Sequence, residues 1–140
     1  RKPCNFRLAA GIRVGVPGAA RTKQPAGAPD FMIVEQRTYL FHAGRIPEFL
    51  SLYEQGGALA LQKRILGNLI GYFVAEMGEL NQTVHLWGYD SLDERARRRG
   101  ELMQEQVWRD FLKAALPMVV RQQSTILLPT SFSPIGARTT

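Results

Sequence analysis

The sequence has few of the residues that build disulfides, metal sites or membrane spans. Its 140 residues include a single cysteine, Cys4, so an intramolecular disulfide and a cysteine-based metal site are both excluded. Charged or polar residues interrupt every hydrophobic stretch before it reaches the roughly 18 apolar residues of a membrane-spanning helix. We therefore expect no membrane insertion.

The motifs of nucleotide-dependent and hydrolytic enzymes are also missing. The sequence contains no Gly-rich phosphate loop, dinucleotide fingerprint, nucleophile elbow or zinc-binding pair. Its two histidines, His42 and His85, have no cysteine or acidic cluster near them in the sequence. We therefore expect neither a metal nor a cofactor.

The net charge of +6 is carried by one end of the chain. Residues 1–29 contain six basic residues and no acid, whereas the 12 acids of the rest are matched by an equal number of bases. Residues 30–140 therefore have no net charge and lack the excess of basic residues that is typical of nucleic-acid-binding domains, so we do not expect nucleic acid as a partner.

Residues 1–31 are rich in Gly, Pro, Ala and Arg and have no sustained helix or strand period. We expect a disordered basic tail there and a single domain over residues 32–135, followed by a short tail at 136–140. The basic tail is either a mitochondrial presequence or material upstream of a natural start at Met32. The second account is preferred, because the segment lacks serine and its prolines would break an amphipathic helix.

Hydrophobic periodicity predicts strands and helices in alternation. The expected strands are 32–40, 69–76, 83–89 and 122–128, and the expected helices are 45–64, 91–104 and 106–118. Ser91 and Glu94 form a capping box, and Gly56-Gly57 should kink or break the first helix. This order predicts an α+β fold of the ferredoxin-like, split β-α-β kind, with a four-stranded antiparallel sheet covered by helices on one face only. The uncovered face predicts a homodimer.

Several blocks of the sequence resemble the NIPSNAP family. They are residues 33–39 with 44–49, residues 69–73, residues 78–92 continuing into Glu94-Arg95 and 97–99, and residues 129–130 with 132–134. The resemblance covers about residues 32–135 and implies a dimeric α+β barrel. That superfamily includes small monooxygenases, isomerases and haem-degrading enzymes, together with members of no known reaction. Animal members of the family are mitochondrial and act through partner binding.

Alternation along two strands gathers the candidate site residues on one face of the sheet. One strand places Glu35, Arg37 and Tyr39 on that face, and another places Thr83, His85, Trp87 and Tyr89 there. The opposite, more apolar face, with Val34, Thr38, Leu40, Val84 and Leu86, is expected beneath the helices, so the polar and aromatic face should look into the barrel. A cavity there could bind a small anionic or aromatic ligand.

Each candidate residue has a functional and a structural interpretation. The ligand-binding residues would be Glu35, Arg37, Tyr39, Trp87 and Tyr89, and the catalytic residue would be His85, whose ordinary pKa lies near neutrality. Alternatively, Glu35 and Arg37 belong to a buried charge network that fixes the register of the dimer. We interpret His42 as a solvated turn residue, and Arg95, Arg97, Arg98 and Arg99 as a solvated, salt-bridged helix face.

Two functional hypotheses follow. The first is a NIPSNAP-like domain of uncharacterised biochemical role that binds a small ligand or a protein partner as a homodimer. The second is a cofactor-independent monooxygenase or isomerase that uses the barrel interior. The expected location is the cytoplasm, with the mitochondrion as the alternative.

Overall fold

The computed structural model describes residues 32–135. Its strands are β1 (Ile33–Phe41), β2 (Asn68–Val74), β3 (Gln82–Tyr89) and β4 (Val119–Leu127). Its helices are α1 (Ile46–Gln55), α2 (Ala58–Leu66), α3 (Leu92–Gln104) and α4 (Gln106–Ala115), with a 3-10 turn, η1 (Leu116–Met118), after α4. The expected tails at residues 1–31 and 136–140 lie outside the described residues.

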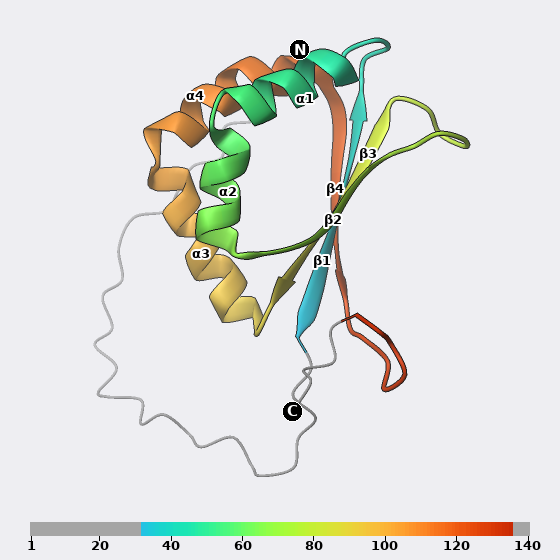
Figure 1. Ribbon diagram of the computed structural model, residues 1–140, viewed down its shortest axis with the longest axis vertical. Coiled ribbons are helices and arrows are strands. Elements are labelled where there is room, and N and C mark those ends of the chain that lie inside the picture. Colours follow the sequence, from blue (N-terminus) through green and yellow to red (C-terminus); the bar gives the residue numbers. More distant parts are fainter. Residues whose placement is uncertain (1–31, 136–140) are drawn as a thin grey trace, which may run out of the picture.

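The strands form one antiparallel sheet in the order β2-β3-β1-β4. The helices all lie on one side of this sheet, and its other side carries no helix (Figure 1). At one end of that side, Val34 is only 5% exposed and lines a pocket together with residues that follow β4. This arrangement confirms the predicted ferredoxin-like α+β fold. None of the helices within residues 32–135 has the length and apolar character needed to cross a membrane.

The expected break in the first predicted helix is confirmed, since α1 ends at Gln55 and Gly57, which has a left-handed backbone with φ of 78°, precedes α2. Other boundaries differ from those expected. The last strand begins at Val119 instead of Gln122, because the turn containing Pro117 ends the preceding helix earlier and Val119 pairs with Phe41. The Ser91 half of the capping box is confirmed, since the Ser91 hydroxyl accepts from Glu94 N at 3.1 Å, while the Glu94 carboxylate accepts from Asp90 N at 2.6 Å.

The assignment of the two sheet faces from the sequence is wrong. Glu35, His85 and Trp87 are each at most 2% exposed, and they lie on the face that the helices cover. The more apolar side chains lie on the face without helices, which we call the open face. It consists of Gln82, Val84 and Leu86 of β3, Val34, Gln36, Thr38 and Leu40 of β1, Phe73 of β2, and Arg121, Gln123, Thr125 and Leu127 of β4.

The physical reason for this reversal is that the polar groups on the covered face have hydrogen-bond partners in the helices and in the sheet. Glu35 binds arginine side chains of α3, and the imidazole of His85 is bonded to the indole of Trp87. Because these groups are paired, the polar and aromatic face can be buried at modest cost. Polarity alone therefore did not tell which face was covered.

Aromatic side chains fill the core between the helices and the sheet. Phe49 and Tyr53 of α1 lie within 5.7 Å and 5.5 Å of Phe111 of α4, measured between ring centroids. Trp108 packs on the same ring at 5.2 Å. This aromatic layer fixes α1 and α4 above the sheet and forms one wall of the candidate site.

Candidate functional site

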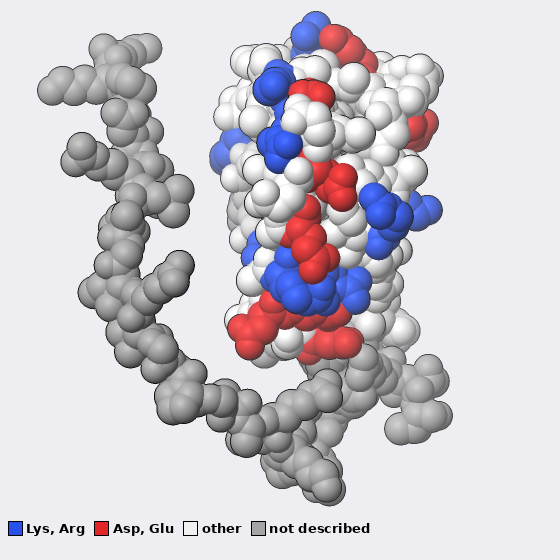
Figure 2. Space-filling view, turned by 90° about the vertical axis from the view of Figure 1, so that its left-hand side faces the viewer, with Lys and Arg blue, Asp and Glu red and all other residues white. Residues whose placement is uncertain are grey.

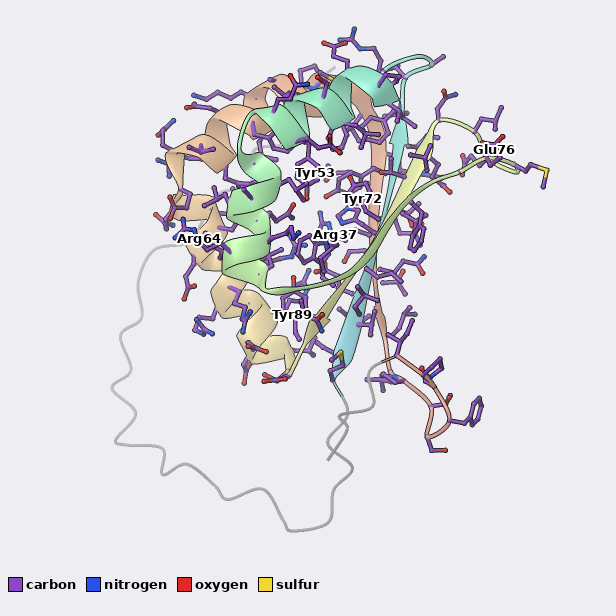
Figure 3. The ribbon with its side chains drawn as sticks, in the orientation of Figure 1. Arg37, Tyr53, Arg64, Tyr72, Glu76 and Tyr89 are labelled. Atoms are coloured by element: carbon purple, nitrogen blue, oxygen red, sulfur yellow. The ribbon has the colours of Figure 1, made fainter. Side chains whose placement is uncertain are left out.

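The six candidate residues from the sequence lie together on the helix-covered face. Arg37 pairs with His85 across the β1–β3 ladder, and Glu35 pairs with Trp87. Figure 3 shows Arg37, Tyr72 and Tyr89 in the space between the sheet and the helices. The sequence therefore identified a true spatial cluster, although it lies under the helices of its own protomer.

Glu35 is the centre of a buried charge cluster. Its Oε1 accepts hydrogen bonds from Arg95 Nη2 at 2.6 Å, Ser124 Oγ at 2.6 Å and Arg37 Nη1 at 3.1 Å. Its Oε2 accepts from Arg99 Nε at 3.1 Å and from the Tyr89 hydroxyl at 3.4 Å. Five donors thus surround one carboxylate whose side chain is fully buried.

The surrounding donors keep Glu35 ionised. Burial by itself would raise the pKa of this carboxyl, because desolvation disfavours the charged form. The hydrogen bonds from Arg95 and Ser124 and the positive charges of Arg99 and Arg37 outweigh burial and lower the pKa to about 2. Glu35 is therefore an anion at neutral pH and is unsuited to act as a general acid there.

His85 lies on the next strand, among aromatic rings. Its Nδ1 accepts a hydrogen bond from Trp87 Nε1 at 2.8 Å, so the neutral ring carries its proton on Nε2. The ring stacks on Tyr72 at 4.6 Å and meets Tyr39 edge-on at 5.0 Å. Within residues 32–135, Nε2 has no hydrogen-bond partner.

The surroundings of His85 hold its imidazole neutral. Burial, together with the positive charges of Arg37 and Arg99, lowers the pKa of His85 to about 3. At neutral pH, the Nε2–H group is then a hydrogen-bond donor and does not serve as an acid in the imidazolium form. Burial also raises the pKa values of Tyr53 and Tyr72, so both phenols keep their protons.

A small cavity adjoins His85. Its volume is about 20 Å³, and its wall includes Tyr39, Tyr53, Tyr72, His85 and Gln62. That volume is sufficient for about one water molecule, whereas drug-sized ligands occupy roughly 300 Å³ or more. The interior is therefore largely filled by side chains.

Besides Arg95 and Arg99 of α3, four contributors to the site were not recognised from the sequence. Tyr53, Tyr72 and Gln62 line the cavity, and Ser124 binds Glu35 from β4. Tyr72 could not be assigned to a sheet face from the alternation of side chains along β2, because the pairing register with β3 shifts between Leu69 and Gly71. Ser124 lies three residues inside a predicted strand, but its carboxylate partner is 89 positions away in sequence.

The arginines of α3 divide into two groups. Arg97 pairs with Glu101 at 2.6 Å and Arg98 pairs with Glu94 at 2.5 Å, so part of the expected salt-bridged face is confirmed. Positive and negative side chains lie interleaved on the helix side of the molecule (Figure 2). Arg95 and Arg99, however, point inward to Glu35, and their four-residue spacing was the signal that they share a helix face.

The remaining histidine lies away from this cluster. His42 is exposed in the turn after β1, as expected. In the part of the chain that the structure describes, no three His, Cys, Asp or Glu residues are grouped so as to hold a metal ion.

Comparison with known proteins identifies the family. The sequence profile of the NIPSNAP family matches residues 34–134. The chain is 48% identical to a NIPSNAP family protein of Agrobacterium tumefaciens, with a TM-score of 0.72 over 74% of this chain and 98% of that one. It is 28% identical to the human protein NipSnap homolog 2 over 79% of this chain and 37% of that protein.

Two further comparisons concern the fold alone. A putative antibiotic biosynthesis monooxygenase of Nitrosomonas europaea, 6% identical, covers 74% of this chain and 95% of its own with a TM-score of 0.54. A dimeric ferredoxin-like protein of an uncultured marine organism, 14% identical, covers 74% and 91% with the same score. The chain spans between 21% and 39% of the lengths of the NipSnap relatives from Caenorhabditis elegans, mouse and human. On the profile match and the bacterial structure, the chain belongs to the NIPSNAP family.

Proposed function

We propose that the chain forms a homodimer through the open face of its sheet and works as a binding domain for a small ligand or a protein partner. The observation that supports this most directly is the composition of the open face. Arg121 is the only charged residue among the strand residues that form it, and Arg121 pairs with Glu79 at 3.2 Å. The rest of this face is apolar or uncharged.

Exposed apolar side chains make this face unfavourable in water. Phe73 is 56% exposed and Leu127 is 40% exposed, at opposite edges of the sheet. A sheet face that combines exposed apolar side chains with uncharged polar ones is commonly an interaction site, and a second copy offers the same surface. The distant ferredoxin-like structure described as dimeric is consistent with this use of the fold.

Substitution on the open face tests the homodimer. Val84 lies on central strand β3 and pairs with Thr38 and Phe73 on the neighbouring strands. Val84→Glu would place a carboxylate in the middle of the proposed interface without disturbing the helix-covered core. We expect light scattering at micromolar concentrations to give a dimer for the wild type and a monomer for Val84→Glu, with unchanged circular dichroism.

A matched control separates the interface from a general effect of added charge. Leu92 is 58% exposed at the first turn of α3, away from the sheet. Leu92→Glu should remain dimeric, since a carboxylate is well tolerated at a helix N-terminus. A monomeric wild type, or a Val84→Glu variant that stays dimeric, would contradict the proposed interface.

Ligand binding is the second part of the proposal, and the candidate residues divide by exposure. The side chain of Arg37 is 16% exposed and Tyr39 is partly exposed, so both can contact a ligand. Glu35, Trp87 and Tyr89 are buried and would hold these contact residues in place. The cavity beside His85, at about 20 Å³, does not admit an organic molecule, so a ligand would contact the partly exposed Arg37 and Tyr39 instead.

A cofactor-independent monooxygenase or isomerase is the alternative, and one observation favours it. The unpartnered Nε2–H of His85 lines the cavity and could donate to a substrate oxygen. The test is oxygen uptake or isomerisation with small phenols and enols. Turnover by the wild type that is lost in His85→Asn would establish the enzyme, whereas no turnover with any compound would leave the binding role.

A cytoplasmic location, with the mitochondrion as the alternative, is included in the proposal. The single cysteine fits a reducing compartment such as the cytoplasm, and the basic residues 1–29 are the ground for the mitochondrial alternative. Subcellular fractionation of the source cells would decide between the two compartments.

A further inference from the structure

The charge cluster around Glu35 contains more positive than negative charge. Ion pairs of 3.1 Å, 2.6 Å and 3.0 Å join Arg37, Arg95 and Arg99 to the same carboxylate. The four side chains therefore carry three formal positive charges and one negative charge. Buried charge of one sign is unfavourable unless it is paired, so an excess of two positive charges favours a further anion.

The three guanidinium groups also have hydrogen-bond donors left over. Each guanidinium carries five N–H donors, while the two oxygens of Glu35 already accept five hydrogen bonds in all. Within residues 32–135, Arg95 Nε and Arg99 Nη2 are buried and make no hydrogen bond of acceptable geometry. Arg99 Nη2 still lies 3.0 Å from Glu35 Oε2 as an ion pair, whereas Arg95 Nε has no hydrogen bond within these residues.

The cluster is partly exposed to solvent. The side chains of Arg37, Arg95 and Arg99 are 16%, 26% and 19% exposed. Ser124, which belongs to edge strand β4, is exposed and donates its hydroxyl to Glu35. An anion could therefore contact the exposed parts of the guanidinium groups.

We propose that Arg37, Arg95 and Arg99 form a binding site for a small phosphate group beside Ser124. A dianionic phosphate would match the excess of two positive charges, and its oxygens accept from planar guanidinium forks in paired fashion. Glu35 acts as the positioning residue, since it holds all three arginines at one point. The phosphate is either free or carried on a small organic molecule.

This inference names the ligand class of the binding role proposed above. It does not depend on the dimer, because its residues lie on the helix-covered face and the dimer is proposed on the open face. A monomeric chain could still bind phosphate, and a dimer could still fail to do so. The two failures are therefore distinguishable.

Titration with inorganic phosphate and with phenyl phosphate at constant ionic strength tests the site. The readouts are calorimetry and the NMR signals of the arginine side-chain N–H groups, with chloride as the reference anion. We expect saturable binding that shifts the Arg99 Nε–H signal. Tighter binding of phenyl phosphate would assign the site to an organic phosphate, and tighter binding of inorganic phosphate would assign it to the free ion.

Two variants on the same helix locate the binding. Arg99→Gln removes one guanidinium of the cluster and should weaken phosphate binding at least about tenfold. Arg97→Gln removes an exposed arginine that forms an ion pair with Glu101, outside the Glu35 cluster, and it should bind like the wild type. If Arg99→Gln does not fold, Ser124→Ala gives the second measurement, with weaker binding expected. Absence of saturable binding to the wild type, or equal binding by the Arg99 and Arg97 variants, would overturn the proposal.

Discussion

At the scale of single residues, the burial of Glu35 is possible because its hydrogen-bonding capacity is saturated. Its side chain is fully buried, and a lone buried carboxylate would take up a proton instead of remaining charged. The donors from α3 and β4 reverse this and lower its pKa to about 2. Glu35 therefore joins three elements, β1, α3 and β4, through one ionised group.

His85 illustrates the opposite outcome of burial. It is 2% exposed and lies near the positive charges of Arg37 and Arg99, so its charged form is disfavoured twice. Trp87 stabilises the neutral ring further, because the indole N–H donates to an unprotonated Nδ1. The nearest carboxylate, Glu35, has an opposing effect on the pKa that is smaller than these.

The lowered pKa of His85 predicts a loss of stability in mild acid. The unfolded chain binds a proton at this histidine below about pH 6.5, whereas the folded chain does so only near pH 3, so the unfolded state binds more protons between these values. Stability from this residue is complete above pH 6.5 and is lost as the pH falls. We expect about 2 kcal/mol of it to be lost by about pH 5, measured by urea unfolding.

Two asparagine variants check this prediction. His85→Asn keeps an acceptor near Trp87 but removes the titration, so its free energy of unfolding should vary less with pH than that of the wild type. His42→Asn changes an exposed histidine and should leave the wild-type pH dependence intact. An identical pH profile for His85→Asn and the wild type would show that His85 is not held neutral.

At the scale of elements, α3 is attached to the sheet mainly through its arginines. Leu102 is the only buried residue of this 13-residue helix. Arg95 and Arg99 bind Glu35 in the sheet, and Arg98 Nη1 donates to the Leu66 carbonyl at the end of α2 at 2.7 Å. Charged contacts thus supply for α3 the attachment that apolar side chains supply for α4.

Two glycines in this helical layer provide a matched prediction. Gly57 has φ of 78° at the start of α2, whereas Gly100 lies within α3, and an added Cβ would meet no atom within 4 Å at either position. Only backbone conformation distinguishes them. We expect Gly57→Ala to destabilise the protein by about 1 kcal/mol and Gly100→Ala to stabilise it by about 0.5 to 1 kcal/mol.

Thermal or urea unfolding of the two alanine variants gives the comparison directly. Equal effects of the same sign would show that backbone conformation at Gly57 is not what separates α1 from α2. If Gly100→Ala destabilised the protein more than Gly57→Ala, position 100 would make a contact, in a larger assembly, that an added methyl group disturbs.

At the scale of the whole molecule, all four helices lie on one face of the sheet (Figure 1). The charge cluster, the histidine and the cavity are enclosed on that side, and the open face remains. We therefore propose a different role for each face of the sheet. One positions a ligand site within a protomer, and the other joins protomers.

If the open face joins two copies, stability should depend on protein concentration. Mass action favours the folded dimer as the concentration rises, so the melting temperature of the wild type should fall over a hundredfold dilution series. Val84→Glu should melt at the same, lower temperature throughout. A wild-type melting temperature that does not change with concentration would contradict a dimer whose unfolding is coupled to dissociation.

The sequence by itself determined the order of elements, the capping box at Ser91 and the grouping of Glu35, Arg37 and His85 on one face. These features depend on periodicity and local hydrogen bonding, which neighbouring residues carry. The sequence also contains the residue blocks that resemble the NIPSNAP family. The division at Gly56-Gly57 was visible for the same local reason.

Only the tertiary structure decided which face of the sheet the helices cover. A strand pattern distinguishes two faces but not which of them is buried, and here the more polar face is buried because Arg95, Arg99 and Ser124 satisfy it from other elements. The inward direction of Arg95 and Arg99 depends on a partner about 60 residues away, Glu35. Such long-range pairing leaves no periodic trace in the sequence, and it is what forms the candidate phosphate site.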